Sequence, residues 1–262
     1  MGPTLPQLFS LEGKVALVTG GAGFLGSAMC RGLAQAGARV VVASRTLEKC
    51  RRLAEELGPQ HRAVAIDLSD ETNIRTTIDQ VAAEMGRLDI LVNNGYNGPL
   101  ARLDTATGDD FARSLAVGVT GQFVAAQQAA RQMRRVGGGS IINVASMYGL
   151  VASYPEVYEG LETCSPPNYH ATKGALIQLT RHLAAYWARD GIRVNCISPG
   201  AFPHPPVRER MPEFIRRLSE RVPMKRMGEP HELMGAVVFL ASDASSYCTG
   251  HNLVVDGGWT IW

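Results

Sequence analysis

The stretch Thr19-Gly20-Gly21-Ala22-Gly23-Phe24-Leu25-Gly26 joins a short apolar run, Lys14 to Thr19, to a helical pattern that ends near Ala36. A second apolar run, Arg39 to Ala43, follows this helical pattern. Glycines at such a junction let the backbone approach a phosphate group closely, and the free amides at the helix N-terminus attract its charge. The stretch therefore predicts a βαβ unit that binds a nucleotide pyrophosphate.

The same alternation of strands and helices continues to the end of the chain. Further apolar runs lie at Arg62–Ile66, Asp89–Val92, Ser140–Val144, Arg193–Ile197 and Asn252–Val255, separated by helical patterns. Strands of this near-continuous apolar kind belong in a parallel sheet that is covered on both faces. No repeat or linker marks a second domain. We expect an α/β protein with a single dinucleotide-binding catalytic domain over 1–262, a doubly wound parallel seven-stranded sheet of the Rossmann type.

Composition excludes several classes of function. The 26 basic and 24 acidic residues give a net charge of +2, so nothing favours a nucleic acid or a membrane surface as partner. No apolar run is long enough to span a bilayer. The five cysteines have no metal-ligand spacing, and their odd number suits a reducing compartment. We expect a cytoplasmic protein without a metal site.

A second set of residues has the functional groups needed for proton transfer. Tyr169 and Lys173 stand four apart in a helical pattern, and Ser146 follows a predicted strand. A tyrosine that works near neutral pH needs its pKa lowered by about three units from ~10, or ~4 kcal/mol of extra stabilisation of the phenolate. Residues four apart share a helix face, so the Lys173 ammonium can supply this effect. The Ser146 hydroxyl can hold a substrate oxygen.

These residues resemble the short-chain dehydrogenase/reductase family over nearly the whole chain. The resemblance implies hydride transfer between a nicotinamide and a carbonyl or alcohol carbon. It makes Tyr169 the acid/base, has Lys173 lower the phenol pKa and bind a ribose, and lets Ser146 orient the substrate. The cofactor contacts that it implies are Gly20, Gly23, Phe24, Leu25, Gly26, Ser44, Arg45, Asp67, Leu68, Asn94, Gly95, Tyr169, Lys173, Pro199, Gly200 and Phe202.

The residues after the second strand favour NADP(H) as coenzyme. No Asp or Glu is present there to bind an adenosine ribose diol, and Arg45 can pair with a 2′-phosphate. Such a contact, worth ~1.5–3 kcal/mol, gives a roughly ten- to hundredfold preference. NAD(H) remains an alternative, because some NAD enzymes also carry an arginine at this place.

Four positions depart from the family pattern. Phe24 replaces the middle glycine of the main branch, and Tyr96 ends a segment that is usually Asn-Asn-Ala-Gly. His204 replaces a threonine, as a substrate contact or a solvated loop residue. Gly118 replaces an asparagine that holds a water in the family's proton relay. A water could still fill the vacated volume if enough polar groups surround it, and an impaired relay would make Gly118→Asn faster.

Two irregular segments could shape a substrate site. The insertion, at about 150–168, makes Ser146 and Tyr169 stand 23 positions apart, more than is usual in the family, and a structureless segment of this length is often functional. It suits a polyhydroxylated or cationic substrate; the alternative is an exposed loop or a subunit contact. It contains Tyr154, Glu156, Tyr158, Glu159 and Glu162 but no Lys or Arg.

The second segment, a substrate lid at about 201–227, is rich in arginine. Arg208 or Arg210 could hold a carboxylate or phosphate, or they could lie on a solvated helix face. The C-terminal stretch with Trp259 and Trp262 resembles tails that pack against a sister subunit. We therefore expect a homotetramer, or a homodimer as the alternative, unless these tryptophans are intrachain core.

Together these features predict an NADP(H)-dependent oxidoreductase that interconverts a ketone and a secondary alcohol, with a sugar-like small-molecule substrate. Alternative enzymes with the same core are a 3-oxoacyl-thioester reductase and a reductase of a secondary-metabolite ketone. A different class is a non-catalytic NADPH-binding redox sensor, which the loss of asparagine at Gly118 favours.

Overall fold

The computed structural model describes residues 2–161 and 163–261, and seven strands of this part of the chain form one parallel sheet. Their order in the sheet is β3-β2-β1-β4-β5-β6-β7. The strands are β1 (Val15–Thr19), β2 (Arg39–Ser44), β3 (Arg62–Ala65), β4 (Ile90–Asn93), β5 (Gly139–Val144), β6 (Ile192–Pro199) and β7 (Asn252–Val255). The order reverses between β1 and β4, which is where a doubly wound sheet opens a ligand crevice. The predicted fold is confirmed, and the predicted strand ends are at most two residues from those observed.

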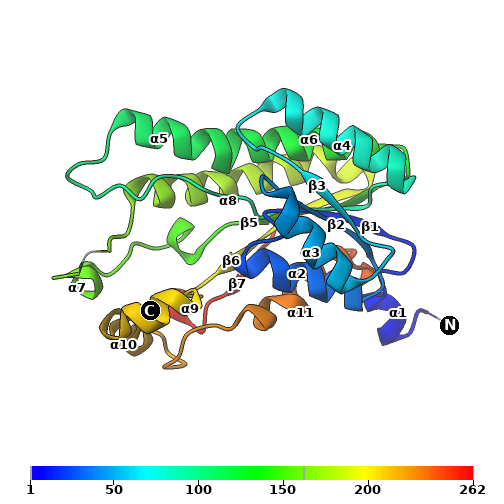
Figure 1. The fold of residues 1–262 in the computed structure, drawn as a ribbon. Helices are drawn as coiled ribbons and strands as arrows, with labels where there is room; N and C mark the ends of the chain where they lie inside the picture. The colour runs from blue at the N-terminus through cyan, green and yellow to red at the C-terminus, as the bar shows by residue number, and fades with distance from the viewer. Residues whose placement is uncertain (1, 162, 262) are drawn as a thin grey trace.

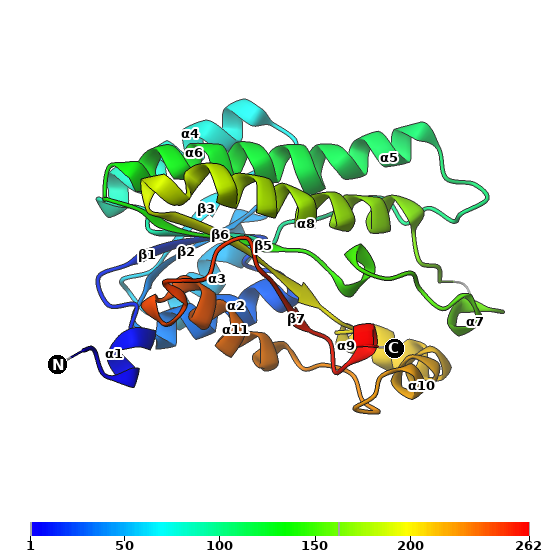
Figure 2. The ribbon, with the colours of Figure 1, turned by 180° about the vertical axis from the view of Figure 1, so that it is seen from behind.

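Helices cover both faces of this sheet (Figures 1 and 2). On one face lie α2 (Phe24–Gln35), α3 (Leu47–Leu57) and α11 (Met234–Ala241). On the other lie α4 (Glu71–Met85), α6 (Gln122–Arg134) and α8 (Pro167–Trp187). None of the described helices is both long and apolar enough to cross a bilayer.

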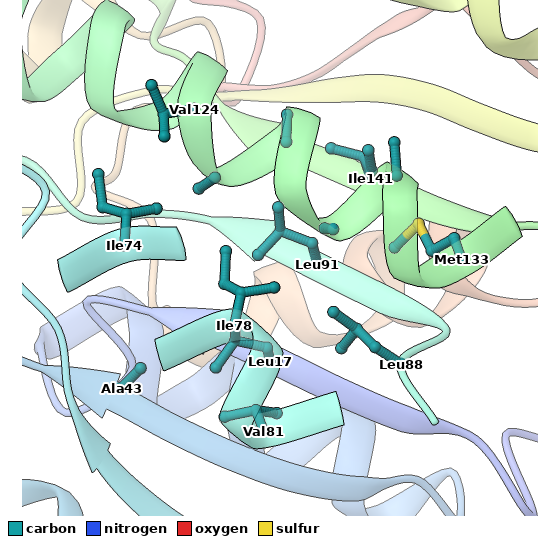
Figure 3. Close-up of a cluster of buried hydrophobic side chains, with 14 of the residues drawn as sticks. Leu17, Ala43, Ile74, Ile78, Val81, Leu88, Leu91, Val124, Met133 and Ile141 are labelled. Atoms are coloured by element: carbon teal, nitrogen blue, oxygen red, sulfur yellow. The ribbon is translucent and has the colours of Figure 1, made fainter. Parts of the chain in front are cut away.

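The covered faces explain why the strands are apolar throughout. All five residues of β1 are buried, because alternate side chains enter the two separate cores. In the core of Figure 3, Leu17, Leu91 and Ile141 of three neighbouring strands belong to one cluster with Ile78 of α4 and Met133 of α6. Each such burial contributes about 1.5–3 kcal/mol, so this packing fixes the sheet on which the crevice is built.

Shorter elements lie at both ends of the sheet (Figure 1). They are α1 (Leu5–Phe9), α5 (Gly108–Leu115), a π-helix (Ala116–Gly121), α7 (Pro155–Tyr158), α9 (Pro205–Arg210), α10 (Pro212–Arg221) and 3-10 turns at Met147–Gly149, Ala188–Asp190, Pro230–Leu233, Asp243–Ser245 and Trp259–Ile261. The insertion is therefore not structureless, since α7 lies within it, although its Glu162 lies outside the described residues.

The C-terminal stretch packs within its own chain. Trp259 is 1% exposed and its ring contacts Tyr154 and Tyr148, with centroids 5.4 and 6.2 Å apart. The core alternative is thus confirmed for Trp259, and Trp262 lies outside the described residues.

Candidate active site

The glycine turn lies at the carboxyl end of β1, and its geometry fits a pyrophosphate. Gly20 has φ +61°, and a Cβ atom on Gly26 would lie 2.1 Å from the Gly20 carbonyl oxygen. Helix α2 therefore packs directly against the turn. Its N-cap is Gly23, which has no side chain to accept from the first amides of the helix. A phosphate can take these amides as donors.

Polar contacts join this turn to the end of β4. The Thr19 hydroxyl oxygen accepts from the backbone amides of Asn94 and Gly95 at 3.1 and 3.2 Å. The Asn94 side-chain amide donates to the Gly20 carbonyl at 3.0 Å. The two strand ends on either side of the crevice are thereby held in register.

A hollow of about 370 Å³ begins at this point and contains most of the predicted site. It brings together residues from the ends of β1, β4, β5 and β6 and from α8. Its lining includes Gly20, Phe24, Leu25, Asn94, Gly95, Tyr96, Ser146, Tyr169, Lys173, Pro199, Gly200, Phe202 and His204. Gly23 and Gly26 do not line it, and they act through the close packing of the turn.

A second hollow of about 140 Å³ continues from the first, with Gly20, Gly95 and Tyr96 in both linings. It contains the remaining predicted cofactor contacts, Ser44, Arg45, Asp67 and Leu68. The two hollows together form an extended crevice across the switch point, a shape that fits a dinucleotide.

Arg45 and Asp67 give this second hollow its polar groups. With the Asn97 amide turned so that its oxygen faces Arg45, the guanidinium donates to that oxygen, 2.8 Å from Nη1 and 3.2 Å from Nη2. The Asp67 carboxylate accepts from the Ser69 amide and hydroxyl at 2.9 and 2.7 Å. These bonds, together with the Arg45 charge, hold the pKa of Asp67 below its usual range. An anionic acceptor and a cation thus lie side by side.

Lys173 and Tyr169 meet at the floor of the larger hollow. Lys173 is 3% exposed, and its Nζ atom donates to the Val144 carbonyl at 2.7 Å. This atom lies 5.6 Å from the centroid of the Tyr169 ring. The Ser146 hydroxyl oxygen accepts from the Tyr148 amide at 3.2 Å, which fixes its direction at the strand end.

The expected lowering of the Tyr169 pKa is wrong for this structure. Burial raises the pKa of the phenol, and hydrogen bonding with Ser146 only partly opposes the rise. Burial also lowers the pKa of Lys173 to about 8. The same low-dielectric surroundings penalise both charges, and the Lys173 ammonium contacts a main-chain oxygen instead of the phenol.

The space beside Gly118 is also different from the expectation. A Cβ atom on Gly118 would lie 2.3 Å from Cγ2 of Thr172 and 3.1 Å from two ring carbons of Tyr96. Side chains therefore fill the volume that a water could have occupied. Gly118 belongs to the π-helix between α5 and α6, a local irregularity that is frequent at functional sites.

An ion pair and other side-chain contacts join the acidic insertion to the basic lid. Glu156 of α7 pairs with Arg221 of α10 at 2.5 Å. Arg217 donates to the Glu159 carbonyl at 2.7 Å, and the Tyr158 ring lies 5.3 Å from that of Phe214. Glu156 is exposed, and its carboxylate pairs with Arg221 of the lid and does not line the larger hollow.

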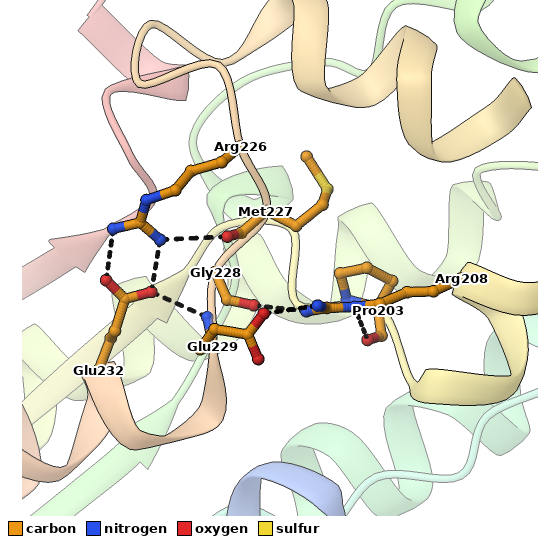
Figure 4. A network of polar contacts seen from close by, with 7 residues as sticks. All are labelled: Pro203, Arg208, Arg226, Met227, Gly228, Glu229 and Glu232. Atoms are coloured by element: carbon orange, nitrogen blue, oxygen red, sulfur yellow. Dashed lines mark hydrogen bonds and ion pairs between the residues drawn. The ribbon is translucent and has the colours of Figure 1, made fainter. Parts of the chain in front are cut away.

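Arg208 fastens the base of the lid (Figure 4). Its guanidinium donates to the Pro203 and Gly228 carbonyls at 3.1 and 2.9 Å and pairs with Glu229 at 2.5 Å. It is therefore neither available to a substrate anion nor on a solvated face. Arg210 has no side-chain partner among the described residues, so both of its interpretations stay open.

His204 lines the larger hollow together with Tyr96, which was not assigned a role from the sequence. The His204 ring lies 4.4 Å from that of Phe24 and is exposed, so both of its interpretations, a substrate contact and a solvated loop residue, stay open. The Tyr96 ring lies 5.3 Å from the Tyr169 ring at 68°. The available signal was a double departure from the family pattern, a large residue at Tyr96 and a small one at Gly118.

Comparisons with known proteins agree with this geometry. A family model described as enoyl-(acyl carrier protein) reductase matches residues 21–260. D-threitol dehydrogenase of Mycolicibacterium smegmatis is 36% identical over 97% of this chain and 95% of its own. Galactitol 2-dehydrogenase (L-tagatose-forming) of Cereibacter sphaeroides is 38% identical over 97% and 98%. A crystal structure of a gluconate 5-dehydrogenase from Burkholderia cenocepacia, in complex with NADP and tartrate, has a TM-score of 0.90 at 36% identity, with 99% and 100% of the two chains covered.

Proposed function

The chain belongs to the short-chain dehydrogenase/reductase family, and we propose that it oxidises and reduces a neutral, polyhydroxylated substrate at one secondary alcohol or ketone carbon, with NADP(H) as coenzyme. One observation supports this most strongly. Ser146, Tyr169 and Lys173 line the same hollow as the glycine turn, although they come from distant parts of the chain. The proton donor and the pyrophosphate site therefore lie in one hollow.

The mechanism assigns each side chain a task. The Ser146 and Tyr169 hydroxyls hold the substrate oxygen. When bound, the nicotinamide supplies or accepts the hydride at the substrate carbon. In the reducing direction Tyr169 gives its phenolic proton to the carbonyl oxygen as that oxygen gains charge, and in the oxidising direction it takes the proton from the alcohol. The buried Lys173 ammonium stabilises the phenolate that remains.

A neutral substrate is favoured by how the charges around the site are arranged. The carboxylate of Glu156 and the guanidinium of Arg221 pair with each other, and Arg208 is used at the lid base. None of these three charges is then free for an ionic substrate. D-threitol and galactitol, the polyols in the names of two relatives, are neutral.

The coenzyme proposal rests on Arg45. No carboxylate follows β2, and the guanidinium lines the second hollow together with Ser44. A 2′-phosphate would replace Asn97 as the partner of this cation. The gluconate 5-dehydrogenase that shares this fold was crystallised with NADP.

We further propose that the protein works in the cytoplasm as a homotetramer. All five cysteines are free thiols, in keeping with a reducing compartment. Large apolar side chains on the surface could pack against a second subunit; they include Tyr186 of α8 and Leu115 of α5, which are 62% and 36% exposed. Light scattering behind size exclusion would distinguish a tetramer from a dimer.

The test of the activity is a substrate panel. Galactitol, D-threitol, ketoses, gluconate, a 3-oxoacyl thioester and a bulky polycyclic ketone would be offered with both coenzymes, and the nicotinamide absorbance followed. We expect turnover of neutral polyols and ketoses with NADP(H). Preference for the thioester or the polycyclic ketone would select one of the alternative reductases, and NADPH binding without any turnover would indicate a sensor.

A further inference from the structure

We propose that Tyr96 is a positioning residue of this site, whose ring face holds the Lys173 ammonium in place beside Tyr169. The inference rests on the proposed function in one respect only, that Lys173 and Tyr169 act together on the substrate proton. Nothing in the family pattern suggests it, because that pattern has a glycine where this chain has Tyr96.

The surroundings of the Lys173 ammonium show why a ring is needed. Its single hydrogen bond to a described residue goes to the Val144 carbonyl. The Nζ atom lies over the Tyr96 ring, 5.3 Å from the centroid, and over the Tyr169 ring at 5.6 Å. An ammonium within about 6 Å of a ring centroid is attracted to the ring's negative face, most strongly where water is excluded.

No carboxylate stabilises this cation in the part of the chain that the structure describes. The titratable groups that face it are Tyr169 on its own helix, Tyr96 from the segment after β4, and Cys196 of β6. The Cys196 thiol is itself buried, and burial raises its pKa to about 12, so it is neutral near pH 7. Apart from the Val144 carbonyl, the ring faces are therefore the groups that compensate for burying the charge.

The Tyr96 ring is built into its position. Two glycines make room for it: a Cβ atom on Gly98 would lie 2.1 Å from the Tyr96 hydroxyl oxygen, and one on Gly118 would lie 3.1 Å from the ring. The hydroxyl donates to the Ser114 hydroxyl at 3.3 Å, which also accepts from Asn168 at 2.5 Å. Asn168 directly precedes Tyr169, so this chain of bonds ties the ring to the catalytic helix.

The decisive measurement is the pKa of Lys173 itself. The chain has only four lysines, Lys14, Lys49, Lys173 and Lys225, so the NMR signals of protein with ¹³C-labelled lysine side chains can be assigned with a Lys173→Met sample. The parent would be titrated beside Tyr96→Phe, which keeps a ring, and Tyr96→Leu, which removes it. Tyr96→Met serves if the leucine variant fails to fold.

We expect Tyr96→Phe to keep the parent value and Tyr96→Leu or Tyr96→Met to lower it by about one pH unit. In the kinetics, the alkaline limb of the plot of kcat against pH would shift to lower pH together with the Lys173 pKa. At pH 7.5 kcat would therefore fall about threefold, in the ring-free variants only. An unchanged Lys173 pKa without the ring, or an equal change in Tyr96→Phe, would refute the proposal. The titration needs no substrate, so it stands even if the panel finds no turnover.

Discussion

The Tyr96 ring occupies the space that a side chain on Gly118 would need, since a Cβ atom there would lie 3.1 Å from the ring. The two departures from the family pattern, the large residue Tyr96 and the small residue Gly118, therefore depend on each other. Thr172, whose Cγ2 would be only 2.3 Å from that Cβ, cannot turn away freely because its hydroxyl donates to the Asn168 carbonyl at 2.7 Å.

We therefore predict that Gly118→Ala and Gly118→Asn lower both stability and rate, the opposite of the gain that the sequence suggested. Overpacking of this kind costs about 1–3 kcal/mol, measurable by urea unfolding. Gly108→Ala is the matched control, because nothing lies within 4 Å of its added Cβ. A Gly118→Asn enzyme that is as stable as the parent and faster would show that the relay interpretation was correct after all.

Coenzyme preference should depend on Arg45. Arg45→Ala removes the cation of the second hollow, and we expect the ratio of kcat/KM for NADPH to that for NADH to fall roughly ten- to hundredfold. Arg62→Ala, at the start of β3 and away from this hollow, is the control. An unchanged ratio would mean that Arg45 serves only its contact with Asn97.

The lid should loosen when Arg208 is shortened. Arg208→Met leaves the Pro203 and Gly228 carbonyls and Glu229 without their shared donor. We expect a several-fold rise in KM, a smaller change in kcat, and faster proteolysis between α9 and α10. Arg210→Met, on the same helix but without a partner among the described residues, should leave the cleavage rate unchanged. Equal behaviour of the two variants would contradict the role given to Arg208.

Stability should depend on pH through Lys173. Its pKa is about 8 in the folded protein and 10.5 in its ordinary state. Between these values the unfolded chain binds more protons, so the cost of the buried charge is full below pH 8 and is relieved as the pH rises. Relative to Lys173→Met, the parent should gain about 2 kcal/mol of unfolding free energy from pH 7 to pH 9.5. The difference in unfolding free energy between the parent and a Lys49→Met control should not change with pH. If the difference between the parent and Lys173→Met does not change either, the prediction is refuted.

The sequence predicted the sheet well because its strands are buried on both faces. Runs such as Arg39–Ala43 and Ser140–Val144 are almost entirely apolar, which suits a strand covered on both faces. Glycines mark where the first strand ends. The spacing of Tyr169 and Lys173 likewise fixes their common helix face, whatever surrounds them.

The predictions that the structure corrected depended on contacts between segments far apart in the sequence. Glu156 suggested an acceptor for a substrate, and only the fold shows that its carboxylate pairs with Arg221. The volume beside Gly118 could not be assigned to a water or to Tyr96 before the segment after β4 was placed against α8. The direction of the Tyr169 pKa depends on burial, which a motif does not report.

The convergence of Tyr169, Lys173 and Ser146 on the coenzyme crevice is tested most directly by Tyr169→Phe. NADPH binding, measured by fluorescence titration, would be followed by turnover of the best substrate from the panel. We expect a dissociation constant close to that of the parent and a kcat at least ~100-fold lower, since only the proton donor is lost. A Tyr169→Phe enzyme that binds NADPH and turns over at the parent's rate would contradict it.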